Sequence, residues 1–209
     1  SMPTHAALQN RGTDTLGNRL IYDSDLNITW YDYTKPYDNW WNQVNWAGTL
    51  DVDFGGTHYT DWRLPSTVDG PWVWGYDGTT TAGYNITSSE MGHLFYTELD
   101  NKGYYDTSGN PTGCSSSSPW CLTNKGDFQN LQPNDYWSGT EYAASTGGAW
   151  GFISRNGLQL NGLKASHYGV AIAVRPGDVS APVPEPATML LLGSGLAGLG
   201  LFRRVRRRH

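Results

Sequence analysis

The chain of 209 residues lacks the patterns on which most enzymes and metalloproteins depend. Its five histidines show no His-x-x-x-His spacing, and neither a Gly-x-Ser-x-Gly elbow nor a phosphate-cradling glycine loop occurs. Only three methionines stand against 26 glycines, which argues against long helices. From these absences we expect no enzyme activity, no catalytic residue, no metal ligand and no cofactor.

Basic residues are scarce until the end of the chain. Up to Glu185 the chain carries nine lysine and arginine residues against all nineteen acidic ones, a net charge of about −10. Nucleic-acid phosphates require a basic surface, so we expect no nucleic-acid partner. The other five basic residues end the chain: Arg203, Arg204, Arg206, Arg207 and Arg208.

A long apolar run occurs once, at 187–202, directly before these arginines. As a helix it spans roughly 24 Å, less than a hydrocarbon core of about 30 Å, which makes it a marginal anchor. Pro184-Glu185-Pro186 precedes the run, and arginines resist translocation and stay in the cytoplasm. An ordinary tail anchor has this layout too, but would contain the Pro-Glu-Pro motif only by coincidence.

This order of motif, apolar run and arginines resembles the PEP-CTERM sorting signal of Gram-negative bacteria. In that system an exosortase recognises Pro184, Glu185 and Pro186, and the tail is removed. The resemblance implies an exported protein that is anchored in the inner membrane as a precursor, transiently through 187–202. It further implies a processed form at the cell surface or outside the cell.

The cysteine content agrees with export. Cys114 and Cys121 are the only two cysteines, and an even pair in an oxidising compartment indicates a disulfide. The alternative, a pair of catalytic or metal-binding thiols, has no neighbouring histidine in the sequence. Export by the Sec route also needs a signal peptide, and none begins at Ser1, so we expect that it was removed or left out of this sequence, with Ser1 as a possible tag remnant.

Three regions follow from composition. Residues 1–178 form one domain, 179–186 a linker with the Pro-Glu-Pro motif, and 187–209 an apolar helix with a basic tail. Ten tryptophans and thirteen tyrosines indicate an aromatic core in a loop-rich fold.

Few regular elements are predicted within the domain. A helix begins near Ser88 or Ser89, has Glu90 in its first turn and stops at Gly103. Residues 20–30 alternate partly, as in a strand. Residues 149–175 indicate β-structure that turns at Asn156-Gly157 and again at Asn161-Gly162, because Asn-Gly supplies the positive φ of tight hairpins.

Four sequence blocks resemble the recurring blocks of the Lcl C-terminal domain family. They are LIYDSDLNITW at 20–30, DWRLP at 61–65, YWSGTEY at 136–142 and AVRPG at 173–177. The resemblance covers about 20–178 and implies an α+β, C-type-lectin-like fold with a small antiparallel sheet, one or two helices and long loops. Members are mostly surface or secreted modules, so it favours binding over catalysis.

The blocks also predict packing. Trp62 and Leu64 are expected in the core, with Arg63 between them paired to a carboxylate such as Glu141; the alternative is Arg63 as an anion or glycan ligand. Other tryptophans divide into two groups. Core positions are expected for Trp30, Trp137 and Trp150, and exposed positions, with sugar stacking as one use, for Trp40, Trp41, Trp72 and Trp74.

Two close carboxylate pairs could contribute oxygen ligands to Ca²⁺, Asp23 with Asp25 and Asp51 with Asp53. Neither lies in the Glu-Pro-Asn or Trp-Asn-Asp signature of calcium lectins, so we expect solvated or capping roles. The related fold of formylglycine-generating enzymes catalyses an oxidation with reactive cysteines, but Cys114 and Cys121 lie in the wrong kind of segment for that chemistry.

The segment 150–172 departs from the Tyr-, Asn- and Phe-rich pattern of the resembling family. Each departing residue can be encoded by a codon ending in a pyrimidine, as expected if adenines of Asn-type codons were randomised. This resembles variable proteins of diversity-generating retroelements. The implied ligand-binding residues are Gly151, Ile153, Ser154, Arg155, Leu158, Leu160, Leu163, Ser166, His167, Gly169 and Val170.

Strand alternation is compatible with this use. Trp150 and Phe152 would face the core while Gly151, Ile153 and Arg155 face outwards. The alternative is that the apolar members are interior residues of a divergent chain. The sequence thus predicts a non-catalytic, exported binding module for an unknown protein or glycan ligand; the alternatives are a fixed matrix component that binds polysaccharide and, third, an enzyme.

Overall fold

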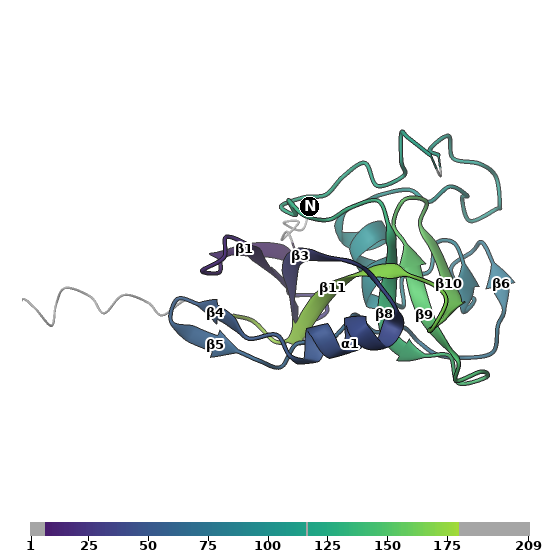
Figure 1. Cartoon of the computed structure of the whole chain (residues 1–209). Helices are drawn as coiled ribbons and strands as arrows, with labels where there is room; N and C mark the ends of the chain where they lie inside the picture. Colours follow the sequence, from purple (N-terminus) through teal and green to yellow (C-terminus); the bar gives the residue numbers. More distant parts are fainter. Residues whose placement is uncertain (1–6, 116, 180–209) are drawn as a thin grey trace, which may run out of the picture.

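The computed structural model describes residues 7–115 and 117–179, and its main element is a nine-stranded sheet in the order β1-β2-β3-β11-β8-β9-β10-β7-β6 (Figure 1). The strands are β1 (Leu8–Thr13), β2 (Arg19–Asp23), β3 (Ile28–Asp38), β6 (Trp74–Gly75), β7 (Ala82–Gly83), β8 (Asp135–Glu141), β9 (Gly148–Ile153), β10 (Leu158–Leu163) and β11 (Gly169–Pro176). Strands β4 (Val52–Phe54) and β5 (Thr57–Tyr59) form a separate small sheet. The helices are α1 (Trp40–Gly48), α2 (Glu90–Gly92) and the π-helix η1 (His93–Glu98).

The predicted mixture of a sheet, short helices and long loops is confirmed. The sheet is larger than expected and is not purely antiparallel, because β11 pairs in parallel with β8 and β6 with β7. The predicted sorting motif, apolar run and arginine tail lie outside the described residues.

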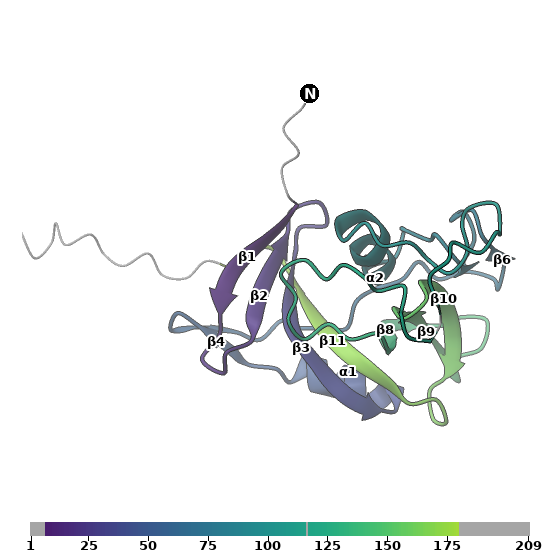
Figure 2. The same cartoon turned by 90° about the horizontal axis from the view of Figure 1, so that it is seen from above.

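Strand β11 lies in the middle of the sheet and is buried from Gly169 to Val174. It pairs antiparallel with β3, where Ala173 lies opposite Tyr31, and in parallel with β8, where Val170 lies opposite Tyr136. The strand therefore joins the β1–β3 meander to the β8–β10 half of the sheet (Figure 2).

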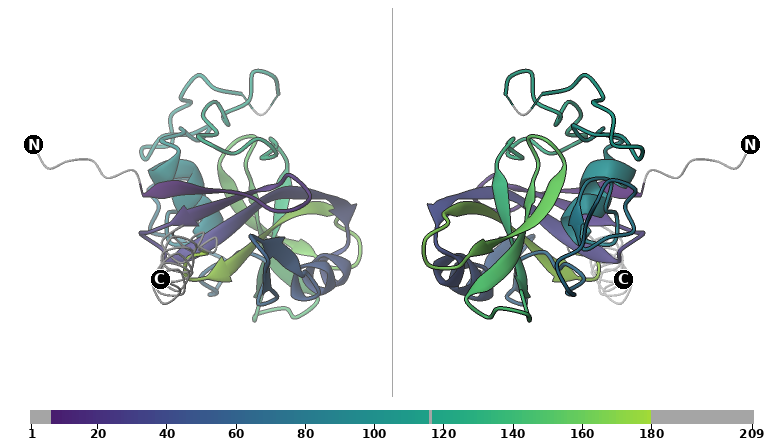
Figure 3. Two further views of the ribbon diagram at one scale, coloured as in Figure 1. Left: turned by 90° about the vertical axis from the view of Figure 1, so that its left-hand side faces the viewer. Right: turned by 90° about the vertical axis from the view of Figure 1, so that its right-hand side faces the viewer.

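The two faces of β11 belong to different hydrophobic cores, because successive residues of a strand point to opposite sides. Val170, Ile172 and Val174 pack in the core that contains Leu94 and Phe95 of the second helical segment. On the other face, Ala171 and Ala173 belong to the core of Trp40 and Ala47 from α1. The two helical segments lie on opposite sides of the sheet (Figure 3).

Helix α1 was not predicted. Asn39 caps its first turn by accepting a 3.0 Å bond from the backbone N–H of Asn42. Trp40, Gln43 and Ala47 form its buried face with the i, i+3, i+7 spacing of a helix. This helical spacing can be read from the sequence, but the tryptophans and asparagines around it give the segment the composition of a polar loop.

The second helical segment starts as predicted. Ser89 is its N-cap and accepts a 3.1 Å bond from Gly92 N–H, and Glu90 occupies the first turn. The predicted end at Gly103 is wrong, because η1 stops at Glu98. Its last turn is closed by a bond from Leu99 N–H to the carbonyl oxygen of Leu94, the five-residue spacing of a π-helix.

Two of the expected β features need correction. Residues 20–30 form two strands rather than one, and the turn between them is capped by Asp23, whose Oδ1 accepts from the N–H groups of Asp25 and Leu26. The Asn161-Gly162 turn does not exist, because both residues pair within β10 against β9. The chain reverses after Leu163 instead.

The expected aromatic core is largely confirmed. Trp62 and Leu64 are buried, as are the three tryptophans assigned to the core, Trp30, Trp137 and Trp150. Of the four tryptophans expected at the surface, Trp40 is buried and donates its indole N–H to Ser138 O at 2.8 Å, while Trp41, Trp72 and Trp74 are exposed.

The predicted disulfide is present between Cys114 and Cys121, with their Cα atoms 5.0 Å apart. It closes part of the long loop between η1 and β8. Within the described residues no free cysteine remains.

Replacing both cysteines by serine is expected to lower the free energy of unfolding by about 2.5 kcal/mol, because the unfolded chain regains the entropy of a short closed loop. Urea denaturation with and without a reductant measures this. The reductant should destabilise the wild type by the same amount and leave the double variant unchanged; an equal effect on both proteins would contradict the prediction.

Candidate functional site

The predicted variable segment lies, up to Leu163, in a regular hairpin of β9 and β10, in which Leu158 pairs with Ile153 and Leu163 with Gly148; the rest forms a loop and the start of β11. The predicted turn at Asn156-Gly157 is confirmed. Gly157 has φ of +81° and donates its N–H to Ile153 O at 2.8 Å. A Cβ there would also lie 2.4 Å from Tyr96 Oη, so both the turn and the packing beneath it require glycine.

One side of this hairpin is fixed by packing. Phe152 lies in the core beside Tyr136 and Phe95. Trp150 is fully buried, donates its indole N–H to Asp69 at 2.7 Å and stacks on Trp72 with the ring planes 9° apart. The hydrogen bond from Trp150 lowers the pKa of the Asp69 carboxyl below its usual range. This side therefore anchors the hairpin.

The other side of the hairpin carries no helix (Figure 3, right). By register, Gly151, Leu158 and Leu160 point to this side, and His167 of the following loop lies beside Leu160 and Gly151 around a shallow hollow. We call Gly151, Arg155, Leu158, Leu160 and His167 the candidate docking face. None of the five is buried.

Asp135 at the start of β8 lies between the two basic members of this face. Arg155 Nη1 lies 2.7 Å from its Oδ1, and His167 Nε2 lies 4.0 Å from its Oδ2. The His167 ring also stands edge-on to Trp137, with ring centroids 5.1 Å apart. The prediction from sequence did not include Asp135, although this residue directly precedes the YWSGTEY block.

Four of the predicted contact residues are buried instead: Ile153, Ser154, Gly169 and Val170. Ser154 Oγ donates to Gln132 O at 2.8 Å and accepts from Asn134 N–H at 3.0 Å, which ties the hairpin turn to the loop before β8. Val170 is part of the core, and a Cβ on Gly169 would lie 2.9 Å from Asp135 O. These four side chains are not available to a ligand, which corrects the predicted set.

The two remaining predicted residues lie at the far end of β10. Leu163 is 63% exposed. It lies an odd number of residues from Leu158 and Leu160 along the strand, so its side chain points to the opposite side of the hairpin. Ser166 is exposed in the loop that follows. They extend the accessible surface without belonging to the docking face itself.

Lys164 anchors this loop from within the variable segment. Its ammonium group is buried, pairs with Glu141, donates to Thr146 O at 2.8 Å and lies 4.2 Å from the centre of the Trp40 ring. The expected pair of Glu141 with Arg63 is therefore wrong. Arg63 instead makes two 2.7 Å bonds to the Glu90 carboxylate.

Arg63 borders a hollow of about 240 Å³ that Trp62, Ser66 and Thr140 also line. Because Glu90 neutralises the guanidinium and Arg63 also donates to Leu64 O at 3.1 Å, the hollow offers no free positive charge from Arg63. The arrangement matches the predicted scaffold role of Arg63.

A second accessible surface contains exposed tryptophans. Trp72 and Trp74 are 44% and 45% exposed, with ring centroids 6.4 Å apart and planes inclined by 32°. Trp72 rests on buried Trp150, and Trp74 meets Tyr84 edge-on. Exposed, braced indoles of this kind offer apolar faces to sugar rings.

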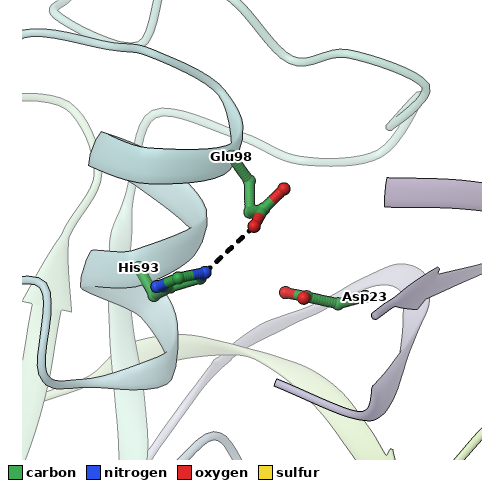
Figure 4. A group of neighbouring side chains, drawn as sticks. All are labelled: Asp23, His93 and Glu98. Atoms are coloured by element: carbon green, nitrogen blue, oxygen red, sulfur yellow. Dashed lines mark hydrogen bonds and ion pairs between the residues drawn. The ribbon is translucent and has the colours of Figure 1, made fainter. Parts of the chain in front are cut away.

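One group of side chains has the composition of a metal site. Asp23 at the end of β2 and His93 and Glu98 of η1 point towards one another (Figure 4), with one donor atom from each lying within 4.8 Å of the others. His93 Nε2 is 2.9 Å from Glu98 Oε1. Burial raises the pKa of Glu98 above its usual range, and the negative charge of Asp23 adds to this.

In the first of the two carboxylate pairs, Asp23 with Asp25, Asp23 caps its turn and belongs to this group of three. Asp51 pairs with His58 at 2.8 Å, and Asp53 Oδ1 accepts from Gly56 N–H at 2.9 Å, which is a turn-capping role. The sequence did not indicate the group of three, because 70 residues separate Asp23 from His93.

Residues 182–208 match the model of the PEP-CTERM protein-sorting motif. No curated protein and no solved structure matches the chain. The motif identifies an exported protein whose precursor is anchored in the membrane, recognised by exosortase and delivered to the cell surface. Between residues 7 and 179, as far as the structure describes them, no helix is long and apolar enough to cross a membrane.

The Asp135–Arg155 pair is expected to be a fixed part of the face. Asp135→Asn should lower the free energy of unfolding by about 1 to 2 kcal/mol, since a partly buried guanidinium loses a charged partner. A double-mutant cycle with Arg155→Met should give a coupling of about 1 kcal/mol, and the exposed Asp51–His58 pair should give a clearly smaller one. Equal coupling in the two cycles would show that Asp135 does not fix Arg155.

Among the predicted ligand-binding residues, substitutions at accessible positions should change the free energy of unfolding less than substitutions at buried positions. Leu163→Asp is expected to change the free energy of unfolding by less than about 0.5 kcal/mol, because the side chain is mostly in solvent. Val170→Ala should cost about 2 kcal/mol, from two lost buried carbon atoms and the cavity they leave. Chemical denaturation of both variants measures the difference, and similar costs would refute the division.

Proposed function

We propose that this protein is a non-catalytic, surface-displayed binding module that contacts a macromolecular ligand, a protein or a glycan, through the docking face on β9 and β10. We further propose that the face is diversified by a retroelement. The observation that carries the proposal is a division within the hairpin: Leu158 and Leu160, two of the departing residues, stay accessible on the side opposite to Trp150 and Phe152, which hold the hairpin in place.

The face has the chemistry of an interface centre. Leu158 and Leu160 supply apolar area, and Arg155 and His167 supply donors next to Asp135. Interface centres combine apolar residues with arginine and a few polar groups. Because the backbone beneath is a paired hairpin, the side chains of Leu158 and Leu160 can change without loss of strand pairing. Gly151 is the less tolerant member of the face, because a Cβ there would lie 2.9 Å from Tyr136 O.

We also propose that the fold is C-type-lectin-like and related to the Lcl C-terminal domain. The four resembling blocks support this, because they meet around β11. The first block, 20–30, covers most of β2 and the start of β3. Most of β8 lies in the block 136–142, and the end of β11 lies in the block 173–177. Arg63 of the fourth block exchanges two backbone hydrogen bonds with Val174, of 2.9 and 2.8 Å. A set of blocks that meets at one strand is what a shared framework requires.

The non-catalytic reading draws support from the cysteines. Cys114 and Cys121 are joined to one another, so neither offers a thiolate for the oxidation chemistry of formylglycine-generating enzymes. Turnover that is lost on Cys114→Ser or Cys121→Ser would favour an enzyme instead.

A second candidate function is a fixed component of the extracellular matrix that binds polysaccharide. The exposed pair of Trp72 and Trp74 favours it, because two indoles 6.4 Å apart suit adjacent sugar rings. The two candidates use different surfaces, so they make separate predictions.

Sequencing this gene with its flanks across many sibling cells tests the diversification directly. We expect substitutions at adenines in codons for the docking face, Leu163 and Ser166, beside a reverse-transcriptase gene and a template repeat. Codons for Phe152, Gln159 and Lys164, whose side chains hold the hairpin in place, should stay constant. An invariant segment without a template would sink the diversification.

If the segment is invariant, binding to the organism's own polysaccharide becomes the decisive measurement. Loss of that binding in a Trp72→Ala and Trp74→Ala double variant, with retention in a Leu158→Ser and Leu160→Ser control, would favour the matrix component. The opposite pattern would keep the docking face as the binding site.

A further inference from the structure

We propose that Asp23, His93 and Glu98 bind a divalent transition-metal cation such as Zn²⁺, which joins strand β2 to the π-helix η1. The three side chains come from two parts of the chain and converge on one point (Figure 4). The site is separate from the docking face, and the proposal does not depend on the proposed binding function.

The π-helix is what brings two of the donors together. His93 and Glu98 are five residues apart, which on an α-helix would turn them about 140° away from each other. In η1 the backbone bond from Leu99 N–H to Leu94 O spans five residues, so residues with this spacing stack on one face. The 2.9 Å contact between His93 Nε2 and Glu98 Oε1 is the result.

The third donor is a buried carboxylate with an oxygen to spare. Asp23 is fully buried, and its Oδ1 accepts two turn-capping backbone bonds. Its Oδ2 has one donor, Trp30 Nε1, at 3.4 Å, which is beyond the usual range of about 2.7 to 3.2 Å. Figure 4 shows this carboxylate aimed at the gap between His93 and Glu98.

The charges around the group call for a cation. Two carboxylates lie within reach of one imidazole, and within the described ranges neither forms an ion pair with a lysine or arginine. The side chain of Glu98 is only 5% exposed, and no bond to its second oxygen occurs among these residues. Buried carboxylates in proteins are paired with a cation or coordinate a metal.

The donor set selects the class of metal. An imidazole nitrogen with two carboxylate oxygens suits Zn²⁺ and its first-row neighbours, whereas Ca²⁺ and Mg²⁺ take oxygen ligands. Three protein ligands leave a fourth position for water. The His93 side chain is 17% exposed, which gives the ion a route from solvent. Closing donor separations of up to 4.8 Å to tetrahedral spacing requires a movement of about 1 Å, within the reach of side-chain rotation.

Metal binding to the full chain in detergent micelles tests the site. After treatment with a chelator and its removal, titration with ZnCl₂ followed by calorimetry and elemental analysis should give one tightly bound ion per chain. Glu98→Gln and His93→Gln should each weaken binding at least about tenfold, because the first replaces an anionic ligand by a neutral amide and the second removes the imidazole nitrogen. The melting temperature of the wild type should rise with Zn²⁺, and that of the two variants should not.

His58→Asn is the matched control, because His58 contacts a carboxylate on the surface but belongs to no group of three among the described residues. It should bind Zn²⁺ like the wild type. A wild-type chain that takes up no Zn²⁺, Co²⁺ or Mn²⁺ would overturn the proposal, as would Glu98→Gln and His93→Gln variants that bind with unchanged affinity. The wild-type titration alone decides the matter if a variant fails to fold.

Discussion

The pairing of β11 with β3 on one side and β8 on the other is the constraint on which the rest of the domain depends. The two partners run in opposite senses relative to β11, and its two faces supply side chains to two separate cores. Branched residues face the π-helix side and alanines face α1, which lets that helix approach the sheet closely. The strand lies between β3 and β8 in the sheet, and its neighbours on the two sides lead to β2, which carries Asp23, and to the hairpin of β9 and β10.

The hairpin of β9 and β10 illustrates how a fixed support and a changeable surface coexist. The hairpin is joined to β8 by strand pairing and to the loop before β8 by Ser154. Lys164 holds the loop at its other end. With both ends and one side held, Leu158 and Leu160 on the remaining side contribute less to the fold than Phe152 does, whereas Arg155 and His167 on that side still contact Asp135 and Trp137.

Local sequence signals predicted part of this arrangement. Asn156-Gly157 forms the expected turn, yet the same dipeptide at 161–162 lies within a strand, because its neighbours pair with β9 and Gly162 leaves room for His167. Alternation assigned Gly151 and Phe152 to the correct sides. It could not show that Ser154 is buried, that Arg63 pairs with Glu90, or that Asp135 and the Asp23–His93–Glu98 group exist, because these depend on contacts between residues distant in sequence.

The position of β11 also determines how the folded domain responds to force. The sorting tail follows this strand in the chain, so traction on the tail is transmitted first to a strand that lies inside the sheet rather than at its edge. A force applied along β11 loads its hydrogen bonds to β3 and β8 in shear. Several of these bonds must therefore break at the same time, rather than one after another. Arg11 donates two hydrogen bonds of 2.8 and 2.6 Å to the Asp178 carboxylate, and Thr29 Oγ1 donates to Gly177 O at 2.7 Å. These bonds hold the residues just after β11, which are the first to be loaded when the tail is pulled.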